Sequence, residues 1–105
     1  MSTRSLGTST SHREENLLEK FVSTETKQLL LTLFHNNPGL IDKTEGIALR
    51  IGRTKSDIET DIADLVELGV LVKKKYGEFE VLFFNPSRDR EIQQTIADQI
   101  LRRHL

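Results

Sequence analysis

The stretch RTKSDIETDIADLVELGVLVKKKYGEFEVLFF, residues 53–84, contains the change of pattern that decides the fold. Its first half has the apolar spacing i, i+4, i+7, i+8 of one helix face, formed by Ile58, Ile62, Leu65 and Val66. After Gly69 the period changes from 3.6 toward 2, which indicates strands. The sequence therefore predicts a helix that ends at Gly69 and is followed by a two-stranded ribbon.

The ribbon is predicted from VLVKKKY and FEVLFF, because both segments are rich in β-branched and aromatic residues. Gly77 and Glu78 lie between them and suit a type II′ hairpin turn. This turn places Tyr76 opposite Phe79 and Lys75 opposite Glu80. One face then carries Val72, Tyr76, Phe79, Val81 and Phe83, and we expect one side of the ribbon to pack on the helices while the lysines stay exposed.

A second helix is predicted directly before the first, with only Gly52 and Arg53 between them. Asp42 and Glu45 have the spacing of a capping box, and Gly52 suits a left-handed C-terminal cap. Thr54 can cap the next helix by accepting from the amide of Asp57. Two helices joined so tightly must cross steeply, as they do in a helix-turn-helix.

The remaining segments complete the expected order. Residues 1–13 are rich in serine and threonine and are predicted to be a disordered tail. A short helix is expected around Leu17, Leu18, Phe21 and Val22, and a longer one begins at Ser23 or Thr24 and runs to the turn at residues 36–39. A last helix, about residues 87–103, has a stripe of Ile92, Ile96 and Ile100.

These elements predict a mainly α fold with a small β-hairpin (α+β) in one domain over residues 14–105. The helix-turn-helix covers about residues 42–68, and the wing covers about 70–84. The predicted core consists of Leu30, Leu33, Phe34, Ile47, Ile51, Ile58, Ile62, Leu65 and Phe83. A chain of 105 residues suits one domain.

Composition limits the functions that the chain can have. It has no cysteine, which excludes disulfides and thiolate metal sites, and its three histidines, His12, His35 and His104, are scattered. We expect no metal and no cofactor. No apolar run resembles a signal peptide or a membrane span, so a cytoplasmic protein is expected. We also expect no enzyme, because no nucleophile–base pair or glycine-rich phosphate loop is visible.

The segment IALRIGRTKSDIETDIADLVELGVLVKK, residues 47–74, resembles winged helix-turn-helix domains. It is similar to prokaryotic transcriptional regulators of the arsenical-repressor and multiple-antibiotic-resistance type. The resemblance covers roughly residues 24–84 and rests on the spacing of Ala48, Gly52, Ile58, Ile62, Leu65 and Gly69. It implies a DNA-binding regulator whose recognition helix, residues 55–68, enters the major groove while the wing contacts the adjacent backbone.

Matching this pattern residue by residue implies a DNA-binding set. The base-facing residues are Lys55, Ser56, Asp57, Glu59 and Thr60, and the wing lysines are Lys73, Lys74 and Lys75. Arg50 and Arg53 would add phosphate contacts. Tyr76 and Phe79 are expected to pack within the hairpin rather than to stack on bases.

The acidity of the recognition helix opposes this assignment, because DNA is a polyanion. The formal net charge of the chain is −1, so any basic surface must be local. Within the helix, neither Asp61 nor Asp64 has a basic partner one turn away. The alternative is a winged-helix protein-interaction module that docks a basic partner on this helix. A homodimer through the terminal helices also remains open, because the Ile92, Ile96 and Ile100 stripe could cover either the core or a second copy.

Overall fold

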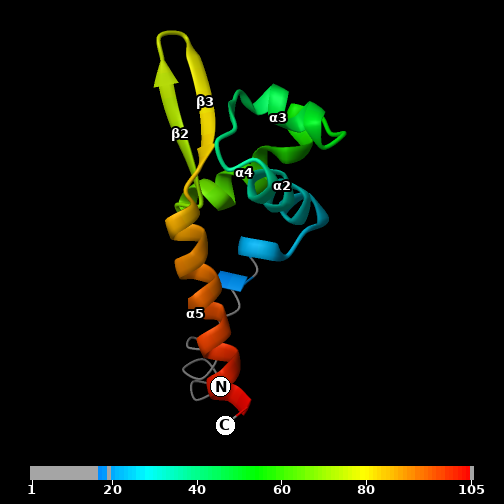
Figure 1. Cartoon of the computed structure of the whole chain (residues 1–105). Helices are drawn as coiled ribbons and strands as arrows, with labels where there is room; N and C mark the ends of the chain where they lie inside the picture. The colour runs from blue at the N-terminus through cyan, green and yellow to red at the C-terminus, as the bar shows by residue number, and fades with distance from the viewer. Residues whose placement is uncertain (1–16, 19, 105) are drawn as a thin grey trace, which may run out of the picture.

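A computed structural model describes residues 17–18 and 20–104, so the tail predicted over residues 1–13 lies outside the described residues. After a helical segment at residues 17, 18 and 20–22, the elements are α2 (Glu25–Asn36), β1 (Ile41–Asp42), α3 (Thr44–Arg50), α4 (Lys55–Glu67), β2 (Leu71–Tyr76), β3 (Phe79–Phe84) and α5 (Pro86–His104). The β2–β3 hairpin projects from one end of the α2–α4 body and α5 projects from the other (Figure 1). This arrangement confirms the predicted winged helix-turn-helix.

Helix α2 begins as the sequence predicts. The hydroxyl of Thr24 accepts a hydrogen bond from the Lys27 amide, and this satisfies a donor that the helix end leaves open. Leu30, Leu31 and Phe34 are buried on the inner face of the helix. At the other end, the Asn37 side chain donates to the Leu33 carbonyl over 2.9 Å. Polar side chains at both ends therefore limit α2 to the segment that carries its apolar face.

The predicted capping box of Asp42 and Glu45 is wrong. Helix α3 begins at Thr44, and its N-cap residue, Lys43, makes no side-chain cap. Asp42 instead belongs to β1, which pairs with β3, and its carboxylate accepts from the Lys43 amide. Because Asp42 pairs with Leu82 in the sheet and its carboxylate binds the adjacent amide of Lys43, Lys43 takes the N-cap position and the helix starts one residue later than the sequence pattern suggests.

The turn between α3 and α4 has the predicted geometry. Gly52 has φ +70°, a conformation that glycine adopts without a steric cost, and the Arg53 amide donates back to the Ala48 carbonyl. Thr54 and Asp57 then form a full capping box at the start of α4. The two helices are therefore fixed at a sharp angle by one glycine and one cap.

The hairpin has the predicted register, but it buries the opposite face. Gly77 has φ +61° whereas Glu78 has no positive φ, which fits a type II′ turn, and Tyr76 pairs with Phe79. Leu71, Leu82 and Phe84 are buried. Phe83 lies on the other face and is only half-buried, so its predicted place in the core is wrong. The short β1 strand, which was not predicted, pairs along β3 to give the order β1-β3-β2.

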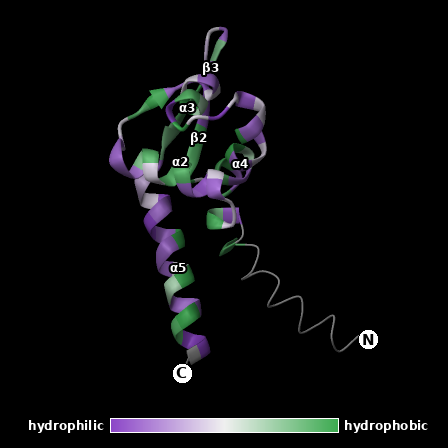
Figure 2. Cartoon of the chain, turned by 90° about the vertical axis from the view of Figure 1, so that its right-hand side faces the viewer, coloured by the Kyte–Doolittle hydropathy of each residue, from purple (hydrophilic) through white to green (hydrophobic). Residues whose placement is uncertain are grey.

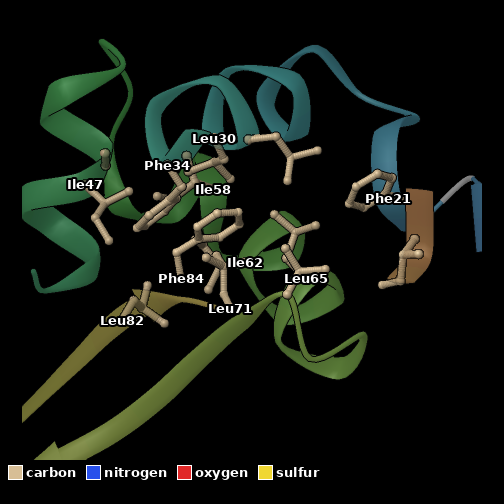
Figure 3. Close-up of a cluster of buried hydrophobic side chains, with 14 residues drawn as sticks. Phe21, Leu30, Phe34, Ile47, Ile58, Ile62, Leu65, Leu71, Leu82 and Phe84 are labelled. Carbon is tan, nitrogen blue, oxygen red and sulfur yellow. The ribbon is translucent and has the colours of Figure 1, made fainter. Parts of the chain in front are cut away.

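The core lies where α2, α3 and α4 meet the base of the wing (Figure 3). Six of the predicted core residues are buried: Leu30, Phe34, Ile47, Ile58, Ile62 and Leu65. Leu33 and Ile51 are half-buried and pack against the cluster. The rings of Phe34 and Phe84 stack with their centroids 5.8 Å apart, and this contact ties α2 to the wing.

Helix α5 is anchored at its first turns. The Asn85 side chain accepts from the Arg88 amide, and the Arg88 guanidinium donates to the Leu68 carbonyl at the end of α4 over 2.8 Å. Ile92 is buried in the core, whereas Ile100 and Leu101 near the far end are 46 % and 61 % exposed. The second half of α5 therefore extends beyond the body, as Figure 2 shows. Within the described residues, no helix has the length and apolar character of a membrane span.

Candidate nucleic-acid interface

The outward side of α4 carries small, neutral side chains. Ile58, Ile62 and Leu65 point into the core, and with 100° per residue the opposite side begins with Ser56, Thr60 and Ala63. All three of these outward residues are exposed. Small side chains allow a helix to come close to the edges of base pairs, and hydroxyl groups can bond to bases or phosphates.

Three acids of α4 are occupied by partners on earlier segments of the chain. Asp61 accepts from the Thr24 hydroxyl over 2.8 Å. Asp64 forms an ion pair of 2.7 Å with the buried Lys27, and Glu67 forms another with Lys20 at 2.7 Å. These acids therefore join α4 to α2 and to the segment before it. Sequence reasoning missed these contacts because it compared charges within one helix, whereas the partners lie tens of residues away.

Asp57 also has a structural role. Its carboxylate accepts from the Thr54 amide over 3.0 Å, and this backbone hydrogen bond is the main reason that its pKa lies below the ordinary value. Glu59 is different, because it forms no hydrogen bond or ion pair with any residue that the structure describes. Of the five acids on α4, Glu59 alone forms neither a hydrogen bond nor an ion pair with a described residue, and its charge acts on the nearby Lys55 through space.

A cleft of about 900 Å³ separates the first half of α4 from the wing and the start of α3. Its charged lining consists of Lys43, Lys55, Lys73, Glu45, Glu59, Glu78 and Glu80. Lys55 pairs with Glu45 at 3.2 Å and Lys73 pairs with Glu80 at 3.7 Å. All four of these side chains are at least 40 % exposed, and exposed pairs of this kind contribute about 0 to 1 kcal/mol. These ion pairs therefore restrain the two lysine side chains only weakly.

The ion pair between Lys55 and Glu45 shifts the pKa of both groups. The hydrogen bond from Lys55 to Glu45 is the main cause that raises the pKa of Lys55. The pKa of Glu45 is lowered, first by a hydrogen bond from its own backbone at the start of α3 and then by Lys55. Both groups are therefore charged at neutral pH.

The other residues that are predicted to contact phosphates also lie on the surface around α4. Arg50 Nε is 3.5 Å from Asp42, and Arg53 Nη2 is 3.4 Å from Glu25. The strand register separates the wing lysines, because Lys73 and Lys75 share the face of Leu82 whereas Lys74 lies on the other face. Lys74 Nζ lies 5.4 Å from the centre of the Tyr76 ring. The three lysines therefore present charge on both sides of the wing.

The wing tip is more exposed than the sequence suggested. Tyr76 and Phe79 are cross-strand neighbours, and both are 56 % exposed. The ammonium group of Lys43 lies 4.0 Å from the centre of the Phe79 ring, close enough for a cation–π contact. The two residues are cross-strand partners, but the core does not cover their rings, so their packing within the hairpin stays a prediction.

Comparison with known proteins supports the fold and leaves the family open. No model of a protein family matches the sequence, and no curated protein matches it significantly. Several solved structures are similar, including two that match most of the chain. One is described as a possible transcriptional regulator for arsenical resistance, with a TM-score of 0.63 and 18 % identity, over 79 % of this chain and 82 % of that one.

The other is a possible transcriptional regulator from Methanosarcina mazei Go1, with a TM-score of 0.63 and 15 % identity, over 85 % of this chain and 80 % of that one. At these identities the likeness concerns the fold. The chain therefore has the winged helix-turn-helix fold of regulator-like structures, including one of the arsenical-resistance type, as its sequence predicted.

Proposed function

We propose that this protein binds double-stranded DNA and regulates transcription, with α4 as the recognition helix and the β2–β3 wing on the adjacent backbone. The observation that carries the proposal is the direction of the acids on α4. Asp61 and Asp64 bind groups of α2 and its N-cap, and Glu67 forms an ion pair with Lys20 in the segment before α2, so each of these three charges has a partner within the chain. The acidity that opposed a DNA-binding role is therefore largely balanced by donors and cations of the same chain.

The proposed phosphate contacts are Arg50, Arg53, Lys55, Lys73, Lys74 and Lys75. Where one of these residues forms an ion pair, its partner is an exposed or half-exposed acid, and the distance between nitrogen and oxygen is 3.2 to 3.7 Å. A phosphate can replace such an acid at little cost, because exposed pairs are weak. Ser56, Glu59 and Thr60 are proposed to face the bases, while Asp57 positions the end of the helix through its cap.

The same proposal includes a homodimer, because a two-fold operator needs two recognition helices. Phe21 and Ile92 are buried in the core of the chain, so they are not available to a second copy. Leu18, Ile100 and Leu101 remain exposed and are the proposed contact. Sedimentation at tens of micromolar tests this, and a clean monomer there contradicts it. Such a regulator works in the cytoplasm, where a prokaryotic chromosome lies.

The competing function is a module that docks a basic protein on the acids of α4. Such a surface needs several carboxylates free to receive cations, and the internal contacts of Asp61, Asp64 and Glu67 work against it. The module therefore has less support than DNA binding, and the experiment below separates the two functions.

The test measures binding of the full chain to genomic duplex fragments as a function of salt. We expect binding near 50 mM salt that weakens linearly in log K against log salt as counterions are released, and Ser56→Ala or Thr60→Ala should change which fragments bind best. Asp61→Asn with Asp64→Asn should raise non-specific affinity, whereas it should abolish the binding of a basic partner. No duplex binding at about 50 mM salt by the wild type or this double variant would reject the regulator.

A further inference from the structure

The acidic side chains of α4 differ in whether they already have a partner within the chain. Asp57 holds the Thr54 amide, Asp61 holds the Thr24 hydroxyl and Asp64 holds Lys27. Glu59 forms no such bond with a described residue, and it is exposed. A carboxylate without a partner on a helix that approaches DNA is repelled by phosphates, unless it meets a donor on a base.

The position of Glu59 favours contact with a base. It lies in the first half of α4, next to Thr60 and three residues after Ser56, both of which are exposed on the outward side. One turn earlier, Lys55 supplies positive charge near the carboxylate and contributes to the attraction of the helix to DNA. The glutamate side chain is also longer than those of Ser56 and Thr60, and it lines the cleft between α4 and the wing beside the neutral surface that they form.

The chemistry of the major groove then selects the base. A carboxylate only accepts hydrogen bonds. Guanine N7 and O6 and thymine O4 are acceptors as well, so they cannot pair with it. Cytosine N4 donates, and glutamate is one of its usual partners. Adenine N6 also donates, but the neighbouring N7 acceptor repels a carboxylate. We infer that Glu59 determines specificity by accepting from cytosine N4 in one C·G pair of each binding site, an inference that rests on the proposed DNA-binding function.

The experiment selects bound duplexes from a randomised library with the full-length wild type, Glu59→Gln, Glu59→Ala and Asp61→Asn. We expect the wild type to select C·G at one position. Glu59→Gln should change that position to A·T, because glutamine pairs with adenine N6 and N7, and the ratio of affinities for the two duplexes should change on the order of 5-fold or more. Glu59→Ala should lose preference at that position alone.

Asp61→Asn is the matched control, because it removes the same charge from the same helix on the side that faces α2. It should raise affinity for all duplexes and keep the C·G preference. If Glu59→Gln and Glu59→Ala bind with the wild-type preference at every position, the cytosine readout is overturned while DNA binding stands. If the wild type binds no duplex, the proposed function itself fails and the readout fails with it.

Discussion

The two flanks of α4 use the same residue types for different purposes. On the flank toward α2, Lys27 is 3 % exposed and its ion pair with Asp64 is 2.7 Å long. On the flank toward the wing, Lys55 and Glu45 are both more than half exposed, and their atoms are 3.2 Å apart. In the first pair the lysine is enclosed by the protein, whereas both members of the second pair are open to water and to any charged ligand.

This difference shows how burial decides the role of a charge. Water and salt screen an exposed pair, so its partners exchange at little cost. A buried lysine has lost its hydration and depends on its hydrogen bonds, so the groups that bind it become part of the structure. We therefore assign stability to the α2 flank and ligand contact to the cleft flank, and the predictions below test that division.

Ile62→Ala should have the largest effect, because Ile62 is 2 % exposed in the core behind α4 and supports both flanks. We expect the free energy of unfolding to fall by about 2 to 5 kcal/mol, from lost burial and the remaining cavity. Urea unfolding followed by circular dichroism measures it. Leu49→Ala is the control, because Leu49 is 77 % exposed and its loss should change little. Equal effects of the two substitutions would contradict the position of the core.

Replacement of Lys73, Lys74 and Lys75 together by alanine tests the cleft flank and the wing. If each lysine contacts one phosphate, the slope of log K against log salt should flatten by up to about three, and affinity should fall similarly for all sequences. The unfolding midpoint should stay near that of the wild type, because all three side chains are exposed. An unchanged salt slope would remove the wing from the proposed interface.

Asp64→Asn and Glu45→Gln form a direct comparison, since each removes one negative charge from one flank. Asp64→Asn should lower the free energy of unfolding by about 1.5 to 3 kcal/mol, because it weakens a charged hydrogen bond to the buried Lys27. Glu45→Gln should lower the free energy of unfolding less than Asp64→Asn does, because its pair with Lys55 is exposed, and should raise duplex affinity about 2- to 5-fold by releasing Lys55. The division of the flanks is wrong if Glu45→Gln proves the more destabilising of the two.

The smallest effect on stability is expected when low pH protonates Asp57 in the capping box of α4. The lowered pKa of Asp57 means that its ionised form stabilises the fold. That stability is fully present above the ordinary carboxyl pKa of 3.8 and is lost as the pH falls through the lowered pKa. Asp57→Asn should therefore be less stable than the wild type at neutral pH, and the two should converge in acid. Urea midpoints at both pH values measure this, and a constant difference would exclude the mechanism.

The sequence predicted most of the elements whose signals are local, and the Asp42–Glu45 capping box is the exception. Gly52, the Thr54 cap and the Gly77 turn each depend on residues within a few positions, and all three are found. The buried face of the wing was not predictable in this way, because both faces of the ribbon carry apolar residues. Only the packing of Leu82 and Phe84 on the helices selects between them.

The sequence could predict which residues form the candidate site, but it could not predict which residues they contact. Helix periodicity correctly placed Ser56 and Thr60 opposite the core. The same periodicity could not show that Thr24 and Lys27 would meet Asp61 and Asp64, because those contacts join helices that lie far apart in the chain. The two-residue strand β1 was missed for a related reason, since a segment so short has no periodicity of its own.

The anchor of α5 has a mechanical consequence. Arg88 fixes the start of the 19-residue helix α5 to the last turn of α4, and Ile92 one turn later is buried in the core, so only the later part of the helix extends freely. The free arm from Ile92 to Leu101 is about 14 Å at 1.5 Å per residue, so a tilt of about 10° at Ile92 moves Leu101 by about 2 Å. Small changes in packing around Arg88 are thereby amplified at Ile100 and Leu101, and a displacement of that tip is transmitted back to the last turn of α4.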